Sequence, residues 1–152
     1  MHGVLKMKDG QLVEVYNADN STLDYWTADP SLILICGLAF DSKGNLWVAN
    51  SGAPNLLSVM EPNGQWHSFN LGGTYSSIDI AALYIDTHDI KWIVRRVGQD
   101  TQVVVFNDNG TLDIAYAVQL TGLNKSIGGL IGNEVNCIAV DKNKGVVWVG
   151  TD

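Results

Sequence analysis

A motif that recurs three times along the chain constrains the fold more than any other feature of the sequence. Each copy has a run of apolar or small residues that ends in Asp, then a short polar turn, then a Trp followed by an apolar residue. The Trp residues are 45 and 56 positions apart. Repeats at this spacing predict an array of similar structural units. The repeated positions are Asp41 and Trp47, Asp86 and Trp92, and Asp141 and Trp148.

A second motif alternates with the first and divides each unit into four extended runs, which we name strands A to D. Turn sequences rich in Asn, Asp and Gly occur at 8–10, 61–64 and 107–110, and such residues favour tight hairpin turns. No stretch shows a sustained helical period, and the longest candidate, 117–133, contains four glycines. The predicted strands of the first complete unit are 35–41, 45–50, 56–61 and 65–71, and those of the second are 80–86, 90–95, 101–106 and 111–118.

This pattern predicts an all-β fold, a β-propeller segment of about three four-stranded antiparallel blades. Strand A is apolar almost throughout, as expected of a strand covered on both faces. Four-stranded units about 45 residues apart are typical of propeller blades, and the Trp in strand B suits the space between two blades. Within one partial propeller, 1–152, we expect strands C and D of a blade at 1–17, complete blades at 35–71 and 80–118, and strands A and B of another at 135–152.

About three blades are fewer than the four to eight of closed propellers. An open stack of blades leaves bare strand edges and apolar blade faces. We therefore expect the chain to be a fragment of a larger propeller that the remaining blades of the parent chain complete. Self-association into a ring is the less favoured alternative.

Charge and hydropathy exclude several classes of partner. The net charge is −7, and the nine Lys and Arg residues are scattered rather than clustered. A nucleic-acid partner requires a basic stripe, so neither a nucleic acid nor an anionic membrane surface is expected. No apolar run approaches the roughly 20 residues of a membrane span, and we expect no membrane insertion. The first residues do not have the pattern of a signal peptide.

The residues around the repeated Trp resemble a known repeat family. Asp-x-x-Gly-x-Leu-Trp-Val at 41–48 and Trp-Val-Gly-Thr-Asp at 148–152 resemble the two-component regulator propeller repeat. Such repeats form the extracytoplasmic sensor region of bacterial hybrid two-component systems and also occur in PorZ-like components of type IX secretion. Two stretches are especially similar to the latter: 57–60 followed by 63–66, and 91–94 followed by 106–111. Only the third copy has Gly-Thr after the Trp motif; the first has Ala49-Asn50 and the second has Val94-Arg95.

The resemblance implies a non-catalytic recognition or sensing module of a larger extracytoplasmic bacterial protein, periplasmic or at the cell surface. The favoured parent is a two-component sensor, whose chain would carry a histidine kinase domain. A PorZ-like cell-surface component of type IX secretion is the first alternative, and an array of blades that only holds partners is another. Gly-Asn-Leu-Trp at 44–47 also resembles streptogramin-lyase-like propellers, but no pairing of nucleophile and base supports an enzyme.

Candidate ligand-binding residues lie on the face that carries the long connections from strand D to the next strand A, predicted at 18–34, 71–79 and 118–134. Loops on a rigid scaffold are common recognition sites, and Tyr, Trp and Arg dominate binding hot spots. The opposite face is expected to carry only tight turns. The ligand is a small molecule, a glycan or a protein. The candidates are Tyr25, Trp26, Tyr75 and, in a loop between strands B and C, Arg95 and Arg96.

For each candidate a simpler interpretation exists: Tyr25 and Trp26 pack over the blade edge, and Arg95 and Arg96 are solvated. No metal or cofactor is expected either. One Asp per blade does not form an oxygen cage, so we expect Asp41, Asp86 and Asp141 to cap the A–B turns. His2, His67 and His88 are isolated in sequence. Cys36 and Cys137 lie in strands of blades that are not neighbours, too far apart for a disulfide, and are expected to be buried free thiols.

Overall fold

The computed structural model describes residues 3–72, 79–97, 100–113, 118–123, 130 and 134–152. Every regular element in these ranges is a β-strand. The strands are β1 (Val4–Lys8), β2 (Gln11–Tyr16), β3 (Leu34–Phe40), β4 (Leu46–Ser51), β5 (Leu57–Met60), β6 (Trp66–Phe69), β7 (Asp79–Ile85), β8 (Lys91–Val97), β9 (Asp100–Asn107), β10 (Val118–Leu123), β11 (Val135–Asp141) and β12 (Val146–Thr151).

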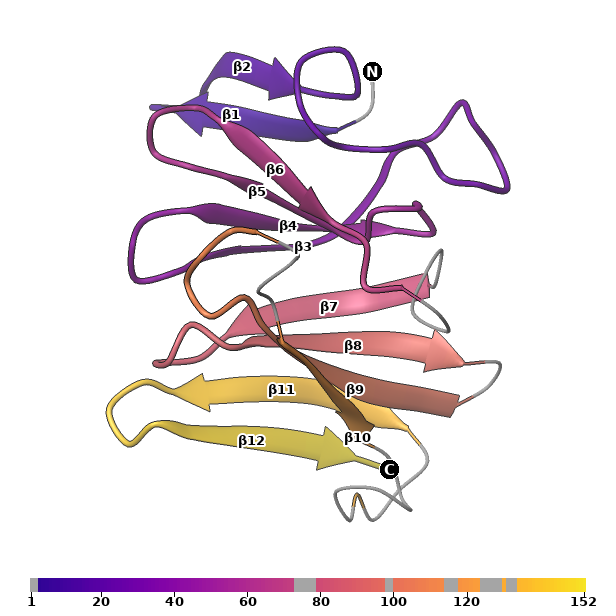
Figure 1. Ribbon diagram of the computed structural model, residues 1–152, viewed down its shortest axis with the longest axis vertical. Helices are drawn as coiled ribbons and strands as arrows, with labels where there is room; N and C mark the ends of the chain where they lie inside the picture. Colours follow the sequence, from indigo (N-terminus) through magenta and orange to yellow (C-terminus); the bar gives the residue numbers. More distant parts are fainter. Residues whose placement is uncertain (1–2, 73–78, 98–99, 114–117, 124–129, 131–133) are drawn as a thin grey trace.

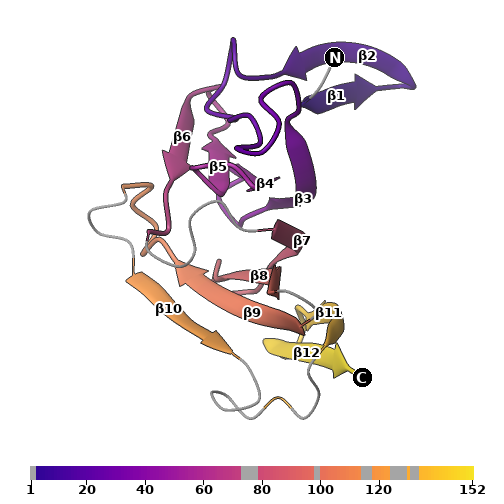
Figure 2. The same ribbon diagram turned by 90° about the vertical axis from the view of Figure 1, so that its right-hand side faces the viewer.

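The strands form four antiparallel sheets that follow one another along the chain (Figure 1). Strands β3 to β6 and β7 to β10 form two four-stranded meanders, and the pairs β1–β2 and β11–β12 form two-stranded sheets. Figure 2 shows the inner strands β3, β7 and β11 near one another on the right, with the outer strands β6 and β10 on the left. This radial arrangement of meandering sheets is that of propeller blades, as the repeats predict.

Apolar side chains fill each of the three spaces between successive sheets. The largest cluster joins the two four-stranded sheets and includes Trp47, Phe69, Leu83 and Phe106. A second cluster lies between the β1–β2 hairpin and the β3–β6 sheet, and a third between the β7–β10 sheet and β11–β12. The sheets therefore pack face to face, and burial of apolar area between them is the main stabilising contribution.

The inner strands share an irregularity that the hydrophobic pattern does not indicate. A β-bulge occurs at the equivalent place in β3, β7 and β11, where the register shifts around residues 36, 81 and 136. Bulges bend a strand and increase its twist. Gly37 follows the first bulge, and a Cβ at this position would lie only 2.6 Å from the Cβ of Leu83. The absence of a side chain there lets β3 and β7 approach each other closely.

One predicted strand is displaced in the structure. We placed strand D of the second complete blade at 111–118, whereas β10 spans Val118–Leu123. The segment 108–113 is occupied by a turn, in which Thr111 donates from its backbone N and Oγ1 to the carbonyl of Asp108 and Leu112 has a φ of 55°. The connection 108–117 is therefore long, and the prediction that this face carries only tight turns is wrong at this point.

The two cysteines are free thiols, but the prediction that both are buried is wrong. Cys36 is partly buried at the bulge of β3, and Cys137 is exposed on β11. Val135 and Ile138 of β11 pack against the β7–β10 sheet. Because the bulge interrupts the alternation of side chains between them, Cys137 falls on the open side of the strand.

Candidate functional site

The turns between the first two strands of each blade are built around the repeated aspartates. Asp41 Oδ1 accepts hydrogen bonds from the backbone N of Lys43 at 3.0 Å and of Asn45 at 2.9 Å. Its Oδ2 accepts from Asn45 Nδ2 at 2.8 Å and from Trp47 Nε1 at 2.9 Å. One carboxylate thus closes the turn, the role that the sequence predicts for it, and also holds the indole that packs between the blades.

The second copy repeats this arrangement and the third departs from it. Asp86 accepts from two backbone amides of its turn and, at 2.9 Å, from Trp92 Nε1. Asp141 also accepts from backbone amides, those of residues 143 and 144. Among the hydrogen bonds of the described residues, none joins Asp141 to Trp148, whose side chain is 65% exposed. The third turn is one residue longer, which changes the path from the carboxylate to the indole.

The hydrogen bonds around Asp41 affect its ionisation. Burial of the carboxyl group by itself raises the pKa of Asp41, but the bonds from Trp47, Asn45 and the backbone amides outweigh burial. The pKa of Asp41 therefore lies below its ordinary value, because these donors stabilise the charged form.

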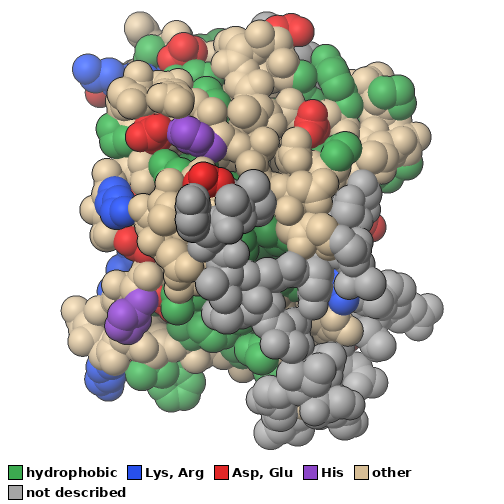
Figure 3. All heavy atoms as spheres, viewed as in Figure 1, with side chains coloured by type: hydrophobic (Ala, Val, Ile, Leu, Met, Phe, Trp, Pro, Cys, Tyr) green, Lys and Arg blue, Asp and Glu red, His purple; other side chains and the backbone are tan. Residues whose placement is uncertain are grey.

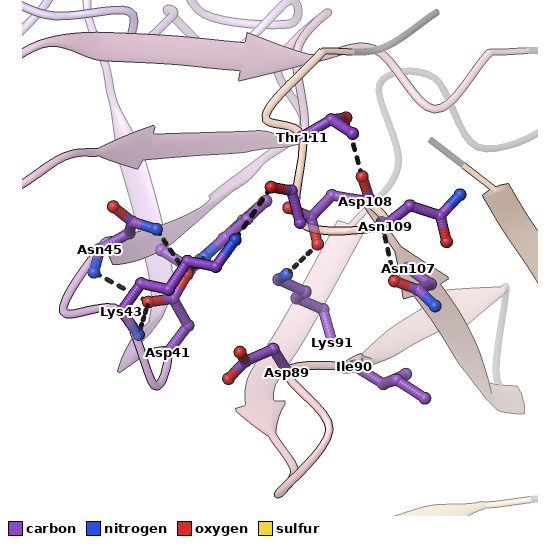
Figure 4. Close-up of polar contacts among 12 residues, drawn as sticks. Asp41, Lys43, Asn45, Asp89, Ile90, Lys91, Asn107, Asp108, Asn109 and Thr111 are labelled. Carbon is purple, nitrogen blue, oxygen red and sulfur yellow. Dashed lines mark hydrogen bonds and ion pairs between the residues drawn. The ribbon is translucent and has the colours of Figure 1, made fainter. Parts of the chain in front are cut away.

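A buried ion pair lies between the two four-stranded sheets (Figure 4). Lys91 of β8 is fully buried, and its Nζ lies 2.6 Å from Asp108 Oδ1 and 3.8 Å from the centre of the Trp47 ring. Asp108 is 3% exposed. The Trp47 ring stacks on Phe69 at 5.3 Å and meets the edge of Phe106 at 6.3 Å. A buried charge requires a close partner, so these five side chains form one unit, the interblade wedge.

Two further polar contacts cross the same gap near the turns. Lys43 Nζ donates to the carbonyl of Gly110 at 2.9 Å. Ser42 donates to Asp89 from its backbone N at 2.8 Å and from Oγ at 2.6 Å. Charged side chains and histidines gather along this edge of the molecule, on the left of Figure 3. Exposed contacts of this kind contribute little energy one by one, but they join the turn 41–45 to the next sheet.

The candidates chosen from the sequence did not include Lys91 or Asp108, although the repeats contain a signal for both. By alignment on the repeated Trp, Lys91 occupies the place of Leu46 in the first copy and Val147 in the third. By alignment on the turn glycines, Asp108 occupies the place of Pro62. Two opposite charges that replace apolar residues, one at the start of β8 and one directly after the neighbouring strand β9, indicate a compensating pair.

The other end of the sheets carries an ordered loop surface. The connection 17–33 docks on the B–C loop 52–56, where Thr27 donates to the carbonyl of Gly52 from both its backbone N at 3.1 Å and its Oγ1 at 3.0 Å. Asp24 accepts from Asn55 Nδ2 at 2.9 Å and donates from its backbone N to Asn50 Oδ1 at 2.7 Å. We call residues 17–33 and 52–56 the loop platform. These bonds hold its backbone in one arrangement.

The two aromatic candidates of the loop platform differ in exposure. Tyr25 is 44% exposed, whereas Trp26 is partly buried. The indole of Trp26 covers Gly52, where a Cβ would lie 2.0 Å from Trp26 Cδ1. Trp26 therefore packs over the blade edge, which is the simpler of the two interpretations of this residue. Tyr25 is the aromatic ring that remains accessible at the surface. Tyr75 lies outside the described residues.

The arginine candidates are in a strand rather than in a loop, which corrects the predicted placement. β8 pairs with β9 through Arg95↔Gln102, Arg96↔Thr101 and onward to residue 97, so the B–C connection is limited to 98–99. Arg95 is partly buried and donates from Nε at 3.1 Å and Nη2 at 2.6 Å to Gln102 Oε1. Arg96 is exposed. Strand pairing with β9 extends β8 through both residues.

The described histidines lie in different elements of the structure. His67 Nε2 lies 2.7 Å from Glu61 Oε1 on the outer hairpin, His88 lies in the turn after β7, and His2 is outside the described part. Among the residues that the structure describes, no three His, Cys, Asp or Glu side chains are placed to hold a metal ion. The same residues include no helix long and apolar enough to cross a membrane.

Substitution of Lys91 by Met tests the interblade wedge. The change leaves Asp108 buried without its partner, so we expect the free energy of unfolding in urea to fall by about 3–5 kcal/mol. Lys144→Met, at an exposed lysine, is the matched control and should change it by less than about 0.5 kcal/mol. The double variant Lys91→Leu with Asp108→Ala leaves no unpaired charge and should lose less than Lys91→Met. A loss of less than about 1 kcal/mol for Lys91→Met contradicts the assignment.

Acid unfolding tests the bonds of Asp41. Because the pKa of Asp41 is lowered in the folded state, its contribution is complete above the unfolded pKa, about 3.9, and is lost as the pH falls through the folded value. Asp41→Asn should flatten the dependence of unfolding free energy on pH below about pH 4. Trp47→Phe removes the indole donor, so the folded pKa of Asp41 rises toward the unfolded value and the loss of stability in acid should become smaller. If both variants keep the pH dependence that the wild-type protein shows below about pH 4, the hydrogen bonds of Asp41 do not cause it.

Comparisons with known proteins agree with the repeat assignment. Residues 129–152 match the family described as two component regulator propeller. The solved structure of PorZ, an essential bacterial surface component of the type IX secretion system of Porphyromonas gingivalis, is similar over 99% of this chain, with 25% sequence identity and a TM-score of 0.83. The matched region is 21% of that PorZ chain.

A second solved structure, virginiamycin B lyase from Staphylococcus aureus, is 16% identical over 76% of this chain and 33% of that chain, with a TM-score of 0.48. No curated protein sequence matches the chain significantly. The resemblance to regulator propeller repeats and to PorZ that the Trp motifs suggest is thus confirmed. The chain is a β-propeller module related to the two-component regulator propeller repeats and to PorZ.

Proposed function

We propose that this chain is a non-catalytic recognition module of a larger extracytoplasmic bacterial protein, and that the parent is a cell-surface component similar to PorZ. The observation that carries the proposal is the similarity to PorZ, which extends over 99% of the chain at 25% identity. Because the similarity covers both the sheets and their connections, it supports the proposal that this module, like the matching part of PorZ, belongs to a larger surface protein. Because one fold serves many roles, the role itself requires the test below.

The loop platform is the surface on which we place recognition. Its backbone is held by hydrogen bonds to Gly52, Asn50 and Asn55, so a ligand does not have to order it. A binding surface that is already ordered loses less conformational entropy when the complex forms. Tyr25 presents an exposed ring on this rigid base, and Tyr is a frequent hot-spot residue. Arg96, exposed at the end of β8 near the same side of the sheets, is a second candidate contact.

A sensor region of a two-component system is the second candidate function. The match of residues 129–152 to the regulator propeller family favours it. In that case the parent chain would continue into a membrane span and a histidine kinase domain. The match to PorZ is broader, since it includes nearly the whole chain, and it supports the surface component more strongly than the sensor.

Protease accessibility in cells distinguishes the two parents. Intact cells that produce the native protein are treated with proteinase K, and the module is detected with an antibody raised against this chain. A surface component should be degraded in intact cells, whereas a periplasmic sensor should be degraded only after the outer membrane is permeabilised. Protection that persists after permeabilisation would contradict both, because it would indicate a location inside the cytoplasmic membrane.

A photocrosslinking residue in place of Tyr25 tests the loop platform in the same cells. We expect a discrete covalent adduct with the partner at this position. The matched control carries the same crosslinker at Leu12, which is 54% exposed on β2, away from the loop platform. Adducts of equal yield at both positions, or none at position 25, would remove the platform as the recognition surface while leaving the cellular location unaffected.

A further inference from the structure

Two positions near the end of the second strand differ in chemistry between the two complete blades. They lie three and four residues after the repeated Trp, and they are Asn50 and Ser51 in the first blade and Arg95 and Arg96 in the second. The strand pairing supports this alignment, because in both blades the first of the two positions pairs with the isoleucine near the start of the inner strand. An amide and a hydroxyl in one blade therefore correspond to two guanidinium groups in the other.

In the first blade, the second of these positions joins its sheet to the next sheet. Ser51 is 3% exposed, and its Oγ accepts a hydrogen bond at 2.9 Å from the backbone N of Ile80 in β7. A buried backbone N–H requires such an acceptor. The hydroxyl at this position therefore has a structural role between the blades.

In the second blade this role has moved to the neighbouring strand. Val135 of β11 is the equivalent of Ile80, and its backbone N donates to Thr101 Oγ1. Thr101 lies directly opposite Arg96 in the pairing of β8 with β9. A guanidinium group has no acceptor, so Arg96 does not take the place of Ser51, and Thr101 supplies the hydroxyl instead. Arg96 is thereby released from the contact between sheets.

Arg96 is the arginine that is accessible to a ligand. It is exposed, and within the described part of the chain it makes no ion pair, although Asp79 is its ladder partner on β7. Arg95 is partly buried, donates to Gln102 and lies on the other face of the sheet, since side chains alternate along a strand. These two residues are the only arginines of the chain. An exposed arginine without a structural role favours a contact with another molecule.

The surroundings of Arg96 favour one kind of bound group. A guanidinium fork donates two parallel N–H bonds to a planar carboxylate. Asp79 and Glu134, which precedes Val135, are exposed acidic residues at the same rim, and they repel a doubly charged phosphate more than a singly charged carboxylate. Arg96 also lies on a regular, paired strand, whereas small molecules bind in concave pockets, so a protein partner is favoured.

We propose that Arg96 binds an Asp or Glu carboxylate of a protein partner at the loop end of the gap between the β7–β10 sheet and β11–β12. Arg96 shares a face of β8 with Val94, which packs in this gap. The contact rests on the proposed recognition function and specifies the chemistry of one part of it. Because Thr101 carries the bond between the sheets, the guanidinium group can bind and release a partner without disturbing that bond.

Photocrosslinking in cells tests this contact. The native parent protein is produced with a crosslinking residue in place of Asp79, the ladder partner of Arg96, and we expect a covalent adduct with a protein. Arg96→Gln should lower the yield of that adduct about tenfold or more, as the loss of a hot-spot contact does. Arg96→Lys should lower it less, because the charge remains and the fork is lost. Lys144→Gln, which removes the same charge from an exposed lysine, is the matched control and should leave the yield unchanged.

The crosslinked segment of the partner supplies a second measurement. The Asp or Glu of that segment nearest to the crosslink is changed to the corresponding amide. We expect the same loss of adduct as for Arg96→Gln, and no further loss when the two changes are combined. An adduct with a glycan, an adduct with a segment that has no acidic side chain, or an adduct that survives Arg96→Gln overturns the proposal.

Thermal unfolding of the purified native protein separates binding from a structural role. Arg96→Gln should leave the melting temperature unchanged, whereas Thr101→Val should lower it, because the Thr101 hydroxyl joins the sheets. A lower melting temperature for Arg96→Gln would make Arg96 a structural residue and overturn the proposal. An adduct at position 25 without one at position 79 would also overturn it, while recognition by the loop platform would stand.

Discussion

The indole of Trp47 is the contact on which the arrangement of the two complete sheets depends. Its Nε1 is held by the turn carboxylate of its own sheet, and its ring lies against Phe106 and Lys91 of the next sheet. A large flat side chain buries much apolar area, and one polar bond at its edge fixes its direction. Because the bond comes from Asp41 six residues earlier, the shape of a local turn determines how two sheets meet. The six-residue spacing from Asp to Trp in the first two copies is the spacing at which the carboxylate reaches the indole.

The wedge around this indole also holds a cation, which changes its energetics. Lys91 stands where the other copies have Leu46 and Val147, so an apolar gap contains a buried charge. The ammonium group is stabilised by Asp108 and by the face of the Trp47 ring. Such a pair adds little net stability over an apolar pair, but separation of its members is costly. Both members of the pair belong to the β7–β10 sheet, so the pair fixes the turn after β9 against β8, and the contact of the Lys91 ammonium with the Trp47 ring is the part that reaches the preceding sheet.

The repeats predicted most of the fold, because strand positions, turns and the Trp contacts follow from local sequence. The differences arise where contacts between distant residues decide the outcome. β8 continues through Arg95 because β9 pairs with it, and β10 begins late because Thr111 folds back on Asp108. Cys137 is exposed because a bulge shifts the alternation of β11. Of the candidate site, the sequence indicated Tyr25. It did not indicate the buried Lys91, because only the structure shows that Lys91 pairs with Asp108, the second charged residue at an apolar position of the repeat.

The two ends of the sheets differ in a way that bears on function. At the turn end, Lys43 and Ser42 connect one sheet to the next, so a ligand there would compete with contacts that join the blades. At the loop end, the bonds of Thr27 and Asp24 stay within the loop platform and its own sheet. Substitution or ligand binding at the exposed Tyr25 ring therefore leaves the interblade wedge intact. The sheets are also joined at the loop end, where Ile80 N donates to Ser51 Oγ at 2.9 Å, but the bonds of the loop platform through Thr27 and Asp24 do not involve the next sheet. The loops of the platform can therefore vary while the sheets stay joined, which is the physical reason to place recognition there.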